Sequence, residues 1–564
     1  MRLALAFFFA LAGNAAAPTT AIKVDQVGYL PGFAKLALVV AKAPLSQFTV
    51  RRVSDGSIAF EGKLAEAVFD ADSGDSVQAA DFTALRASGE YYLEVPASGR
   101  SWRLRIGDEV FARAFYLTTR AFYGQRCGTA VDLGPEFPGY RHPACHLAGA
   151  YHASSGMRAP KNNPGGWHDA GDYGRYVVNS GITTATLLWA WEMFGERVGK
   201  VSLNLPESGN GVPDLLNEVR WNLDWMLSMQ DTDGGVWQKQ TSETFPGFVM
   251  PEKDNTLSQV IGTGRAPYKS SCATADFAAV GAIAARVYRP FDAAYAEKSL
   301  RAARHAWSWL SGNPNVLFKN PTGVSTGEYG DSDCGDERLW AAAELWRTTR
   351  EPAYESYFLD HFPEYRSTLR DPNPEPWSMM APMAMWTYVL AGGNNATAKA
   401  IREASVEAAD EIVARTAHNG YHVSLTAADY VWGSNGVAAN YGTQLLVANA
   451  FHPDRRYVAA ALDNLHYLLG RNTFSLSFVT RLGENPVRHP HHRPSGSGLY
   501  DQPWPGLLAG GPNSHRQDDA SKALPDMPPA KIYLDQQGSY ATNEIAINWN
   551  ASLVFLLAGV SGAR

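Results

Sequence analysis

Two periodicities of hydrophobic residues divide this chain of 564 residues into a shorter first part and a longer second part. In the first part, apolar positions alternate with polar ones or form short runs, separated by Gly, Pro, Asp and Ser. These runs are residues 22–29, 37–40, 48–53, 91–95 and 102–106. Such a pattern is typical of short strands with one buried face. It predicts a small antiparallel β-sandwich that ends near Gly107 and Asp108.

From residue 111 onward, apolar positions recur every three or four residues, which is the period of an amphipathic helix. Twelve segments have this period: 111–123, 177–195, 212–229, 273–288, 291–310, 336–348, 352–361, 378–391, 396–415, 436–450, 455–469 and 543–559. Twelve helices in one domain predict a closed double ring of antiparallel helix pairs, in which the loops at one end form a cleft. Residues 471–540 make an unusually long connection, which we interpret as a wall of that cleft.

Carboxylates with a possible catalytic role lie in two connecting segments. Gly165–Tyr173 reads GGWHDAGDY and contains Asp169 and Asp172, while the segment 536–544 ends at Glu544. Both segments come just before predicted helices, so we expect them at the same end of the ring. Two carboxylates, one acting as base and one as acid, are the minimum apparatus for glycoside hydrolysis. For Asp-Ala-Gly-Asp taken alone, a solvated turn is an equally good interpretation.

The amino end and the composition limit where the protein acts and what it binds. Residues 1–17 combine Arg2, an apolar run and Ala15-Ala16-Ala17, the pattern of a secretory signal peptide. No apolar run is long enough to cross a bilayer, so we expect a secreted or periplasmic protein without a membrane partner. A net charge of −7 with 19% charged residues gives no basic footprint for nucleic acid. Aromatic residues make up 12% of the chain, and their flat rings suit stacking on sugars.

Two of the four cysteines lie close in sequence to histidines. Cys127, Cys145, His146 and His168 form a Cys2His2 set, which is the donor type of a closed tetrahedral zinc site. The spacing is not that of a small zinc finger, so a Cys127–Cys145 disulfide explains these residues equally well. Cys272 and Cys334 have no evident role, and we expect them to be buried thiols.

Three stretches of the sequence together resemble one enzyme family. They are Gly165–Tyr173; SFVTRLGEN from Ser477 with PHHR at 490–493; and YLD from Tyr533 with YATNEIA at 540–546 and Asn550-Ala551. They resemble the glycoside hydrolase family 9 cellulases, in the bacterial subgroup with an N-terminal immunoglobulin-like domain. The resemblance extends over nearly all of the chain after residue 17. It implies an immunoglobulin-like β-sandwich at 18–107 and an all-α (α/α)6-barrel catalytic domain at 108–564.

The resemblance also implies the reaction, which is hydrolysis of β-1,4-glucosidic bonds with inversion of configuration. Asp172 would be the general base that activates water, Asp169 would help to hold that water, and Glu544 would be the general acid. Inversion requires the two carboxyl groups to stand ~6.5–9.5 Å apart, so that water fits beneath the sugar. It also requires Glu544 to stay protonated, so we expect apolar or anionic surroundings for it.

Further residues are implied by the same resemblance to bind substrate. They are His491, Arg493, Asp535, Trp432 and Tyr540. For Trp167 we favour support of the core over a stacking platform, and the roles of His489 and His492 stay open. Asp331 stands where some family members place a stacking Trp, which leaves the far subsites undefined.

Structural metals are implied as well. Relatives with the immunoglobulin-like domain carry a structural zinc at the position of the Cys2His2 set, which favours zinc over a disulfide there. Calcium has two candidate sites, one formed by Ser332, Asp336 and Glu337 and the other by Glu207, Asn210 and Asp214. Both offer hard oxygen ligands, although acids that cap helix N-termini explain them too.

We interpret the chain as a secreted, monomeric endo-1,4-β-glucanase without a catalytic cofactor, acting on cellulose, related β-glucans or cello-oligosaccharides. Exo-acting members of the same family (cellobiohydrolases, β-glucosidases and exo-glucosaminidases) share the apparatus, so the sequence leaves the mode of action open. A non-catalytic carbohydrate-binding protein would not need three separated acids. A zinc hydrolase would need an open coordination position, which four protein ligands do not leave.

Overall fold

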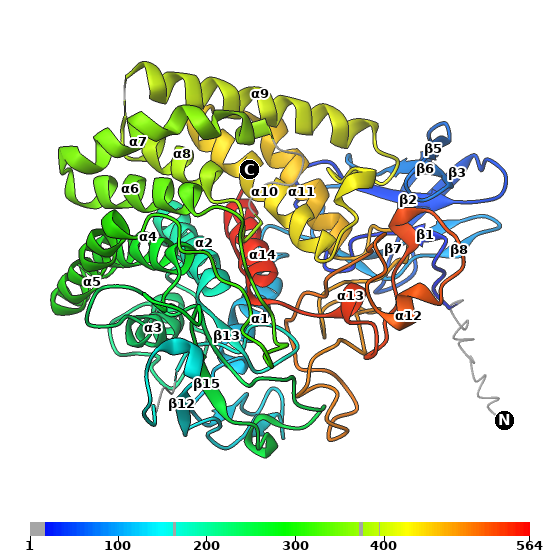
Figure 1. The fold of residues 1–564 in the computed structure, drawn as a ribbon. Coiled ribbons are helices and arrows are strands. Elements are labelled where there is room, and N and C mark those ends of the chain that lie inside the picture. The colour runs from blue at the N-terminus through cyan, green and yellow to red at the C-terminus, as the bar shows by residue number, and fades with distance from the viewer. Residues whose placement is uncertain (1–16, 162–164, 371–375, 394, 564) are drawn as a thin grey trace, which may run out of the picture.

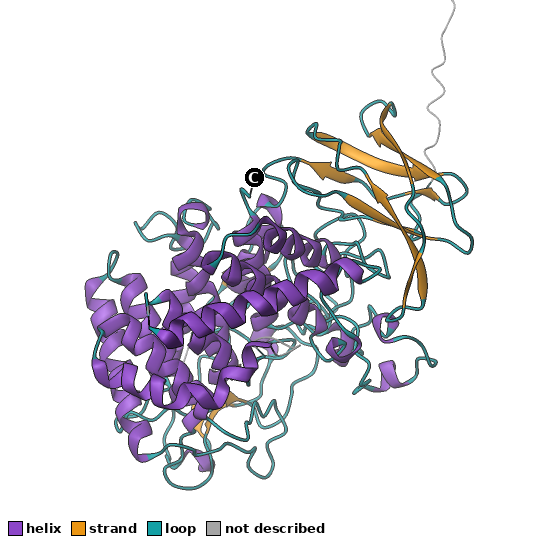
Figure 2. Cartoon of the chain, turned by 90° about the horizontal axis from the view of Figure 1, so that it is seen from above, coloured by secondary structure: helices purple, strands orange, loops and turns teal. Residues whose placement is uncertain are grey.

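The computed structural model describes residues 17–161, 165–370, 376–393 and 395–563. The predicted signal peptide therefore lies outside the described residues, except for Ala17. Figure 2 shows strands gathered at one end of the molecule and helices in a separate, larger body. Among the helices of the described residues, none combines the length and the apolar character needed to cross a membrane.

The first part of the chain is the predicted β-sandwich. Its strands are β1 Ile22–Lys23, β2 Leu36–Val40, β3 Gln47–Arg52, β4 Ile58–Lys63, β5 Val68–Asp70, β6 Asp75–Asp81, β7 Gly89–Val95, β8 Gly99–Arg100 and β9 Leu104–Ile106. One sheet has the order β1-β2-β6-β5, and the other has β4-β3-β7-β8 with β9 also paired to β7. The alternation predicted for β7 holds, because Tyr91, Leu93 and Val95 are buried between partly exposed neighbours. The inner faces of the two sheets enclose a hydrophobic core that is separate from the core of the helical domain.

The second part contains all twelve predicted helices. They are α1 Ala112–Gly124, α2 Val177–Val198, α3 Asp214–Ser228, α4 Ser271–Tyr288, α5 Ala293–Gly312, α6 Gly335–Thr349, α7 Pro352–Tyr365, α8 Ala381–Leu390, α9 Ala396–His418, α10 Ser434–Phe451, α11 Arg455–Leu468 and α14 Ile547–Val560. The two remaining helices, α12 Asp519–Lys522 and α13 Tyr540–Asn543, are single turns.

Burial separates these helices into an inner and an outer set. Helices α4, α8, α10 and α14 are buried on almost all sides, as is most of α2 and α6, whereas α5, α7 and α9 bury one stripe. A helix that is apolar all round belongs in an interior, and Figure 1 shows α14 in the middle of the helical body. Small residues allow the layers to approach closely, since a Cβ at Gly281 of α4 would lie 3.2 Å from the Cβ of Ala303 on α5.

A further sheet of four strands, which the sequence pattern did not predict, lies among the loops of the helical domain. Its strands are β12 Gly149–Tyr151, β13 Arg175–Tyr176, β14 Lys239–Thr241 and β15 Ser258–Ile261, in the order β12-β15-β14-β13. A further pair is β10 Val131–Asp132 with β11 Arg141–His142. Strands of two to four residues are too short to show a period. The larger of these sheets matters for function because β13 directly follows the Gly165–Tyr173 segment.

The β-sandwich is fastened to the helical domain by buried polar contacts. The Asp25 carboxylate lies 2.7 Å from Nδ1 of His466 on α11, and both side chains are buried. The backbone N–H of Gln26 donates to the Leu469 carbonyl, and its side chain donates to the Ser475 carbonyl at 2.9 Å. The two domains therefore share a desolvated interface in which a lost partner is costly.

We expect Asp25→Ala to lower the melting temperature of the whole protein. The substitution leaves His466 without its carboxylate partner. It also removes the acceptor of the backbone N–H groups of Val27 and Gly28. Losing a buried polar partner of this kind costs roughly 2–4 kcal/mol. Differential scanning calorimetry checks this, with the exposed Asp55→Ala in the same domain as control. Equal melting temperatures for the two variants would show that the sandwich does not support the helical domain through this contact.

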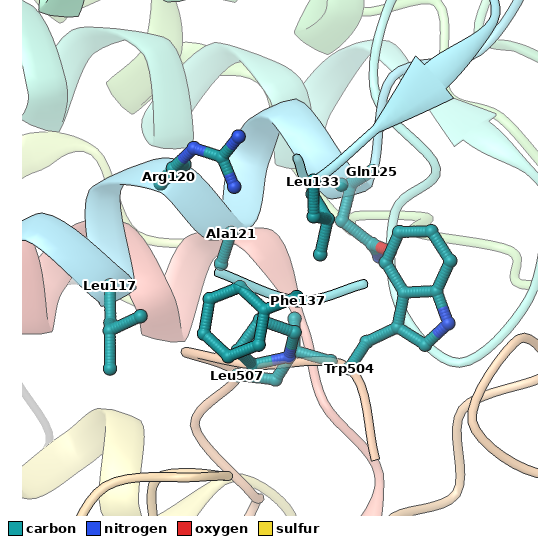
Figure 3. Close-up of a pocket in the computed structure, with 10 residues that line it drawn as sticks. Leu117, Arg120, Ala121, Gln125, Leu133, Phe137, Trp504 and Leu507 are labelled. Atoms are coloured by element: carbon teal, nitrogen blue, oxygen red, sulfur yellow. The ribbon is translucent and has the colours of Figure 1, made fainter. Parts of the chain in front are cut away.

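The long segment 471–540 is anchored on α1. Figure 3 shows Trp504 and Leu507 of this segment around one small apolar space with Leu117, Ala121 and Phe137. The segment is therefore a fixed part of the fold. The main cavity itself is lined by other segments, while Tyr540 lies next to its residue Trp432 and His491 lies next to Tyr540. The role of the segment as a wall of the cleft stays a prediction.

Candidate active site

One cavity of about 390 Å³ collects the three predicted catalytic acids. Asp169 and Asp172 come from the loop before α2, and Glu544 comes from the short stretch between α13 and α14. Six aromatic residues share the lining: Tyr176, Phe245, Tyr329, Trp377, Trp432 and Trp549. The sequence expectation that these segments meet at one end of the helices is thus confirmed.

The two aspartates are held by different partners. Asp172 accepts hydrogen bonds on Oδ2 from the Tyr176 hydroxyl at 2.9 Å and from the Gly174 N–H at 3.0 Å. Asp169 accepts from Nδ2 of Asn179 at 2.7 Å and from the Tyr329 hydroxyl at 2.6 Å. Burial and the nearby charge of Asp172 raise the pKa of Asp169 to about 8, and its two hydrogen bonds oppose that rise. Both carboxylates are fixed in orientation.

The turn between the aspartates is built around Gly171. A Cβ at this position would lie 2.2 Å from the His491 carbonyl oxygen, so no larger residue fits. The Gly171 carbonyl accepts from the backbone N–H of Arg493 at 3.0 Å and from its guanidinium at 2.8 Å. The Gly171 N–H points the other way and donates to Glu544 at 3.3 Å. Gly171 thus joins the loop before α2 to two later segments of the chain, through Arg493 and Glu544.

Glu544 is partly buried in the cavity lining, next to Gly171. Burial raises the pKa of its carboxyl well above the usual range, and the charges of Asp172 and Asp169 raise it further. The Arg493 guanidinium and the Gly171 N–H act in the opposite direction. Burial and the neighbouring anionic charges therefore favour the protonated form of Glu544, as the predicted acid role requires.

The predicted substrate-binding residues divide into two groups. Trp432 and Tyr540 expose 39% and 37% of their surface, with ring centroids 5.4 Å apart, and His491 lies 5.8 Å from Tyr540. Arg493 is buried, with its guanidinium bound to backbone carbonyls. Asp535 accepts the N–H groups of residues 488 and 489 on its two oxygens. The first three can meet a ligand, whereas the last two shape the loops around it.

Two models of known families match the chain. "Glycosyl hydrolase family 9" matches residues 111–557, and "Cellulase N-terminal ig-like domain" matches residues 17–100. The chain belongs to glycosyl hydrolase family 9. It is therefore a glycoside hydrolase, and the predicted fold class, an immunoglobulin-like sandwich followed by an (α/α)6 barrel, is confirmed.

Relatives with known names match this family 9 hydrolase over nearly its whole length. Endoglucanase D of Acetivibrio thermocellus is 39% identical over 95% of this chain and 83% of its own. A cellodextrinase of Butyrivibrio fibrisolvens is 34% identical over 96% of this chain and 99% of its own. The crystal structure of a Zn-binding triple mutant of the family 9 endoglucanase J30 has a TM-score of 0.88 and 36% identity, covering 95% of this chain and 100% of that one.

Several cavity residues of this family 9 hydrolase were missed by the sequence reasoning. Tyr176 and Tyr329 bind the two aspartates, and Phe245 exposes 47% of its surface at the cavity. Tyr176 follows the motif directly, which is a weak signal, but Tyr329 is 160 positions from Asp169 and has none. Trp167 is buried as expected, and its indole N–H donates to Glu218. His492 is buried too, bonded to Gln125 and Ser495.

The Cys2His2 set of this family 9 hydrolase is assembled. The donor atoms of Cys127, Cys145, His146 and His168 all lie within 4.8 Å of one another, and both cysteines are free thiols. Two of the sulfur–nitrogen distances are 3.8 Å, close to the edge of a zinc tetrahedron with bonds of ~2.1–2.3 Å. Nε2 of His146 lies 3.1 Å from Asp254, as a carboxylate that orients a metal-bound histidine does. The residues fit a structural zinc ion.

The first calcium candidate lies in a buried cluster of acids. Both oxygens of Glu337 and both of Asp276 lack hydrogen-bond donors among the described residues. Burial raises the pKa of both carboxyls well above the usual range, and Asp336 adds to this. Donor-free buried oxygens fit a hard cation, and Asp276 joins the predicted set. Ser332 of the predicted set is exposed, and its backbone N–H donates to Asp331.

The second calcium candidate is not assembled. Glu207 forms an ion pair with Arg126 through both oxygens, at 2.9 and 3.1 Å. Oδ1 of Asn210 accepts from Val212 and Asn217. Asp214 accepts the Leu203 N–H at 2.7 Å and the Ser208 hydroxyl. Protein donors engage the oxygens of these three residues, so their arrangement does not favour a cation cage, and calcium at this site stays a prediction.

The prediction for the other two cysteines is wrong. Cys272 and Cys334 form a disulfide across 62 positions rather than remaining buried thiols. It joins the first turn of α4 to the residue before α6. A pairing over this separation depends on the barrel bringing the two helices together, which spacing alone does not reveal.

Proposed function

We propose that the chain is an exported endo-1,4-β-glucanase that hydrolyses cellulose or a related β-glucan with inversion. The observation that carries this proposal is the placement of Glu544, whose pKa is raised by its surroundings, in the same aromatic-lined cavity as two fixed aspartates. The name of the Acetivibrio relative, an endoglucanase, supports the endo mode.

In the proposed reaction, Glu544 donates its proton to the glycosidic oxygen as the bond to the anomeric carbon breaks. Asp172 removes a proton from the attacking water, and Asp169 orients that water. Tyr176 and Tyr329 hold the two aspartates through their hydroxyls, so little reorganisation is needed during the step. One displacement, with water attacking the face opposite to the leaving oxygen, inverts the anomeric centre.

The aromatic rings supply the binding surface in this proposal. Trp432 lines the cavity with the exposed ring of Tyr540 beside it, and Phe245 lines it from the loop between β14 and β15. Such rings stack on the apolar faces of pyranose units. His491 donates through Nδ1 to the Gln537 carbonyl, which leaves Nε2 to accept a sugar hydroxyl.

A timed product profile tests the endo mode. On carboxymethylcellulose, we expect viscosity to fall early while mixed cello-oligosaccharides appear. Steady release of glucose or cellobiose with little change in viscosity would instead identify an exo-acting enzyme, as would be fitting for a cellodextrinase. Activity on neither polymer nor cello-oligosaccharides would overturn the proposed substrate class and turn attention to aminosugar substrates.

The proposed metals are structural. A zinc ion held by Cys127, Cys145, His146 and His168 would fix the segment that continues into Asp169, and four protein ligands leave it no open position for water. A calcium ion would neutralise the cluster formed by Asp276, Asp336 and Glu337. Neither metal takes part in the proposed proton transfers. The Cys272–Cys334 disulfide supports export, because disulfides persist in oxidising compartments.

We expect Cys145→Ser to lose the bound zinc and to melt at a lower temperature than the parent. Structural zinc contributes directly to folding free energy, and without it His168 no longer fixes the catalytic loop. Metal analysis by mass spectrometry should find about one zinc per parent chain. The control is His152→Ala, a partly buried histidine nearby that is outside the set. Full zinc content in Cys145→Ser would remove this site from the proposal.

A further inference from the structure

A buried cation lies behind the catalytic aspartates. Lys239, on β14, has no exposed surface, and its ammonium group has four hydrogen-bond contacts. The acceptors are Asn320 Oδ1 at 2.7 Å, the carbonyl and hydroxyl oxygens of Thr326 at 3.2 and 3.1 Å, and the Gly327 carbonyl at 2.7 Å. All belong to the loop between α5 and α6. Lys239 therefore ties this loop to the small sheet beside the cavity.

The tied loop leads directly to a partner of Asp169. Two residues beyond Gly327, Tyr329 donates its hydroxyl to Asp169 at 2.6 Å. Gln238, the neighbour of Lys239, donates to the Tyr329 carbonyl at 2.8 Å. Two adjacent residues, Gln238 just before β14 and Lys239 within it, thus bind the loop at Tyr329 and at Gly327.

The same ammonium faces the proposed base through an aromatic ring. Nζ of Lys239 lies 5.6 Å from the ring centre of Tyr176 and 5.7 Å from that of Phe318. The hydroxyl of Tyr176 donates to Asp172. The Tyr176 ring thus contacts the ammonium group on one face, and its hydroxyl binds the Asp172 carboxylate, so Lys239 can act on Asp172 through Tyr176.

A neutral side chain would be easier to bury here. Burial lowers the pKa of Lys239 to about 7, while the charges of Asp172 and Glu328 act in the opposite direction. Replacing a buried ion by an apolar residue of similar volume is often neutral or stabilising. The stability of the core therefore does not explain a lysine at this position, whereas an interaction of its charge with the carboxylates does.

We propose that Lys239 is a positioning residue for the hydrolysis, anchoring the loop that carries Tyr329 and stabilising the ionised form of Asp172. This inference rests on the proposed function. Lys239 does not reach the cavity, so it acts through Tyr176 and Tyr329 and does not touch substrate.

Lys239→Met tests the inference because it keeps an unbranched side chain only one atom shorter and removes the charge. Below pH 7, we expect kcat on cello-oligosaccharides to fall ~10–100-fold, as misplaced catalytic groups do, with KM changed less than about threefold. The acidic limb of the kcat/KM profile should move to higher pH by about one unit, because the ionised base loses a favourable charge. Lys239→Arg should recover part of kcat and return the limb toward the parent. The matched control is Lys319→Met, an exposed lysine on the same loop.

Each outcome of this experiment is decisive. A parent-like kcat for Lys239→Met, or a fall in kcat without movement of the acidic limb, overturns the inference. If Lys239→Met does not fold, Asn320→Ala removes one acceptor and keeps the charge. It should then lower kcat severalfold with the limb unmoved, and a parent-like kcat would overturn the anchoring role. Asp172→Asn in parallel separates the two proposals: if it stays active, the proposed function fails, whatever Lys239 does.

Discussion

Asp172→Asn lowers kcat on β-1,4-glucans by roughly 10²–10⁴-fold, the range expected for loss of a proton-transfer group. An asparagine cannot take the proton from water, but its carbonyl oxygen can still accept from Tyr176 and Gly174 as Asp172 does. Binding should therefore persist, and KM should change little. Steady-state kinetics on cellopentaose check this, with circular dichroism to show that the fold is retained.

The control for this variant is Asp501→Asn, an exposed acid in the segment 471–540. It should keep the parent kcat. Proton NMR of the first products of the parent enzyme should show the α-anomer, since one displacement inverts a β-linkage. Near-normal turnover in Asp172→Asn, or a β-anomer as the first product, would falsify the assignment of Asp172 as base.

Glu544→Gln produces a loss that depends on the leaving group. On cellulose, where the leaving oxygen needs a proton, we expect kcat to fall roughly 10²–10⁴-fold. On 2,4-dinitrophenyl β-cellobioside, whose leaving group departs as an anion, the loss should be at least about tenfold smaller. The amide oxygen of the new side chain can still accept from the Gly171 N–H, so the turn should stay in place. A loss of equal size on both substrates would contradict the role of Glu544 as acid.

The pH dependence of the same variant follows from the raised pKa of Glu544. In the parent, kcat/KM on cellulose should fall as pH rises through this pKa, because the proton is lost. In Glu544→Gln this alkaline fall should disappear. A folded-state pKa above the unfolded one contributes stability at low pH that is lost as pH rises, so the variant should gain stability relative to the parent in alkali. Glu403→Gln, an exposed acid on α9, is the control.

The sequence predicted those helices and strands that are long enough to show several repeats of a hydrophobic pattern. Helix α4 buries every residue but one of its 18 and could be recognised by length and composition, and β7 by its alternation. The four-stranded sheet beside the cavity could not, because its strands have two to four residues and are stabilised by tertiary contacts. Lys239 belongs to that sheet, and its importance depends on neighbours 81 to 88 positions away.

The site residues divide in the same way. Asp169, Asp172 and Glu544 stand in segments with an unusual local composition, and the structure brings them into one cavity. Glu207 also stands in an acidic, glycine-rich loop, yet its partner is Arg126, 81 positions earlier. A local pattern can indicate which residues have polar atoms to offer. It cannot tell whether the folded chain already supplies the matching donor.

The contact between Gly171 and Glu544 joins residues 373 positions apart. A growing chain therefore carries Asp169 and Asp172 long before Glu544, so we expect hydrolysis to begin only after α14 has packed into the barrel. An endopeptidase that removes this last helix should silence the enzyme, although most of its mass remains. Conversely, a chain cut in an exposed loop and supplied as two fragments should regain turnover only on reassembly, so that sugar release reports the docking of α14.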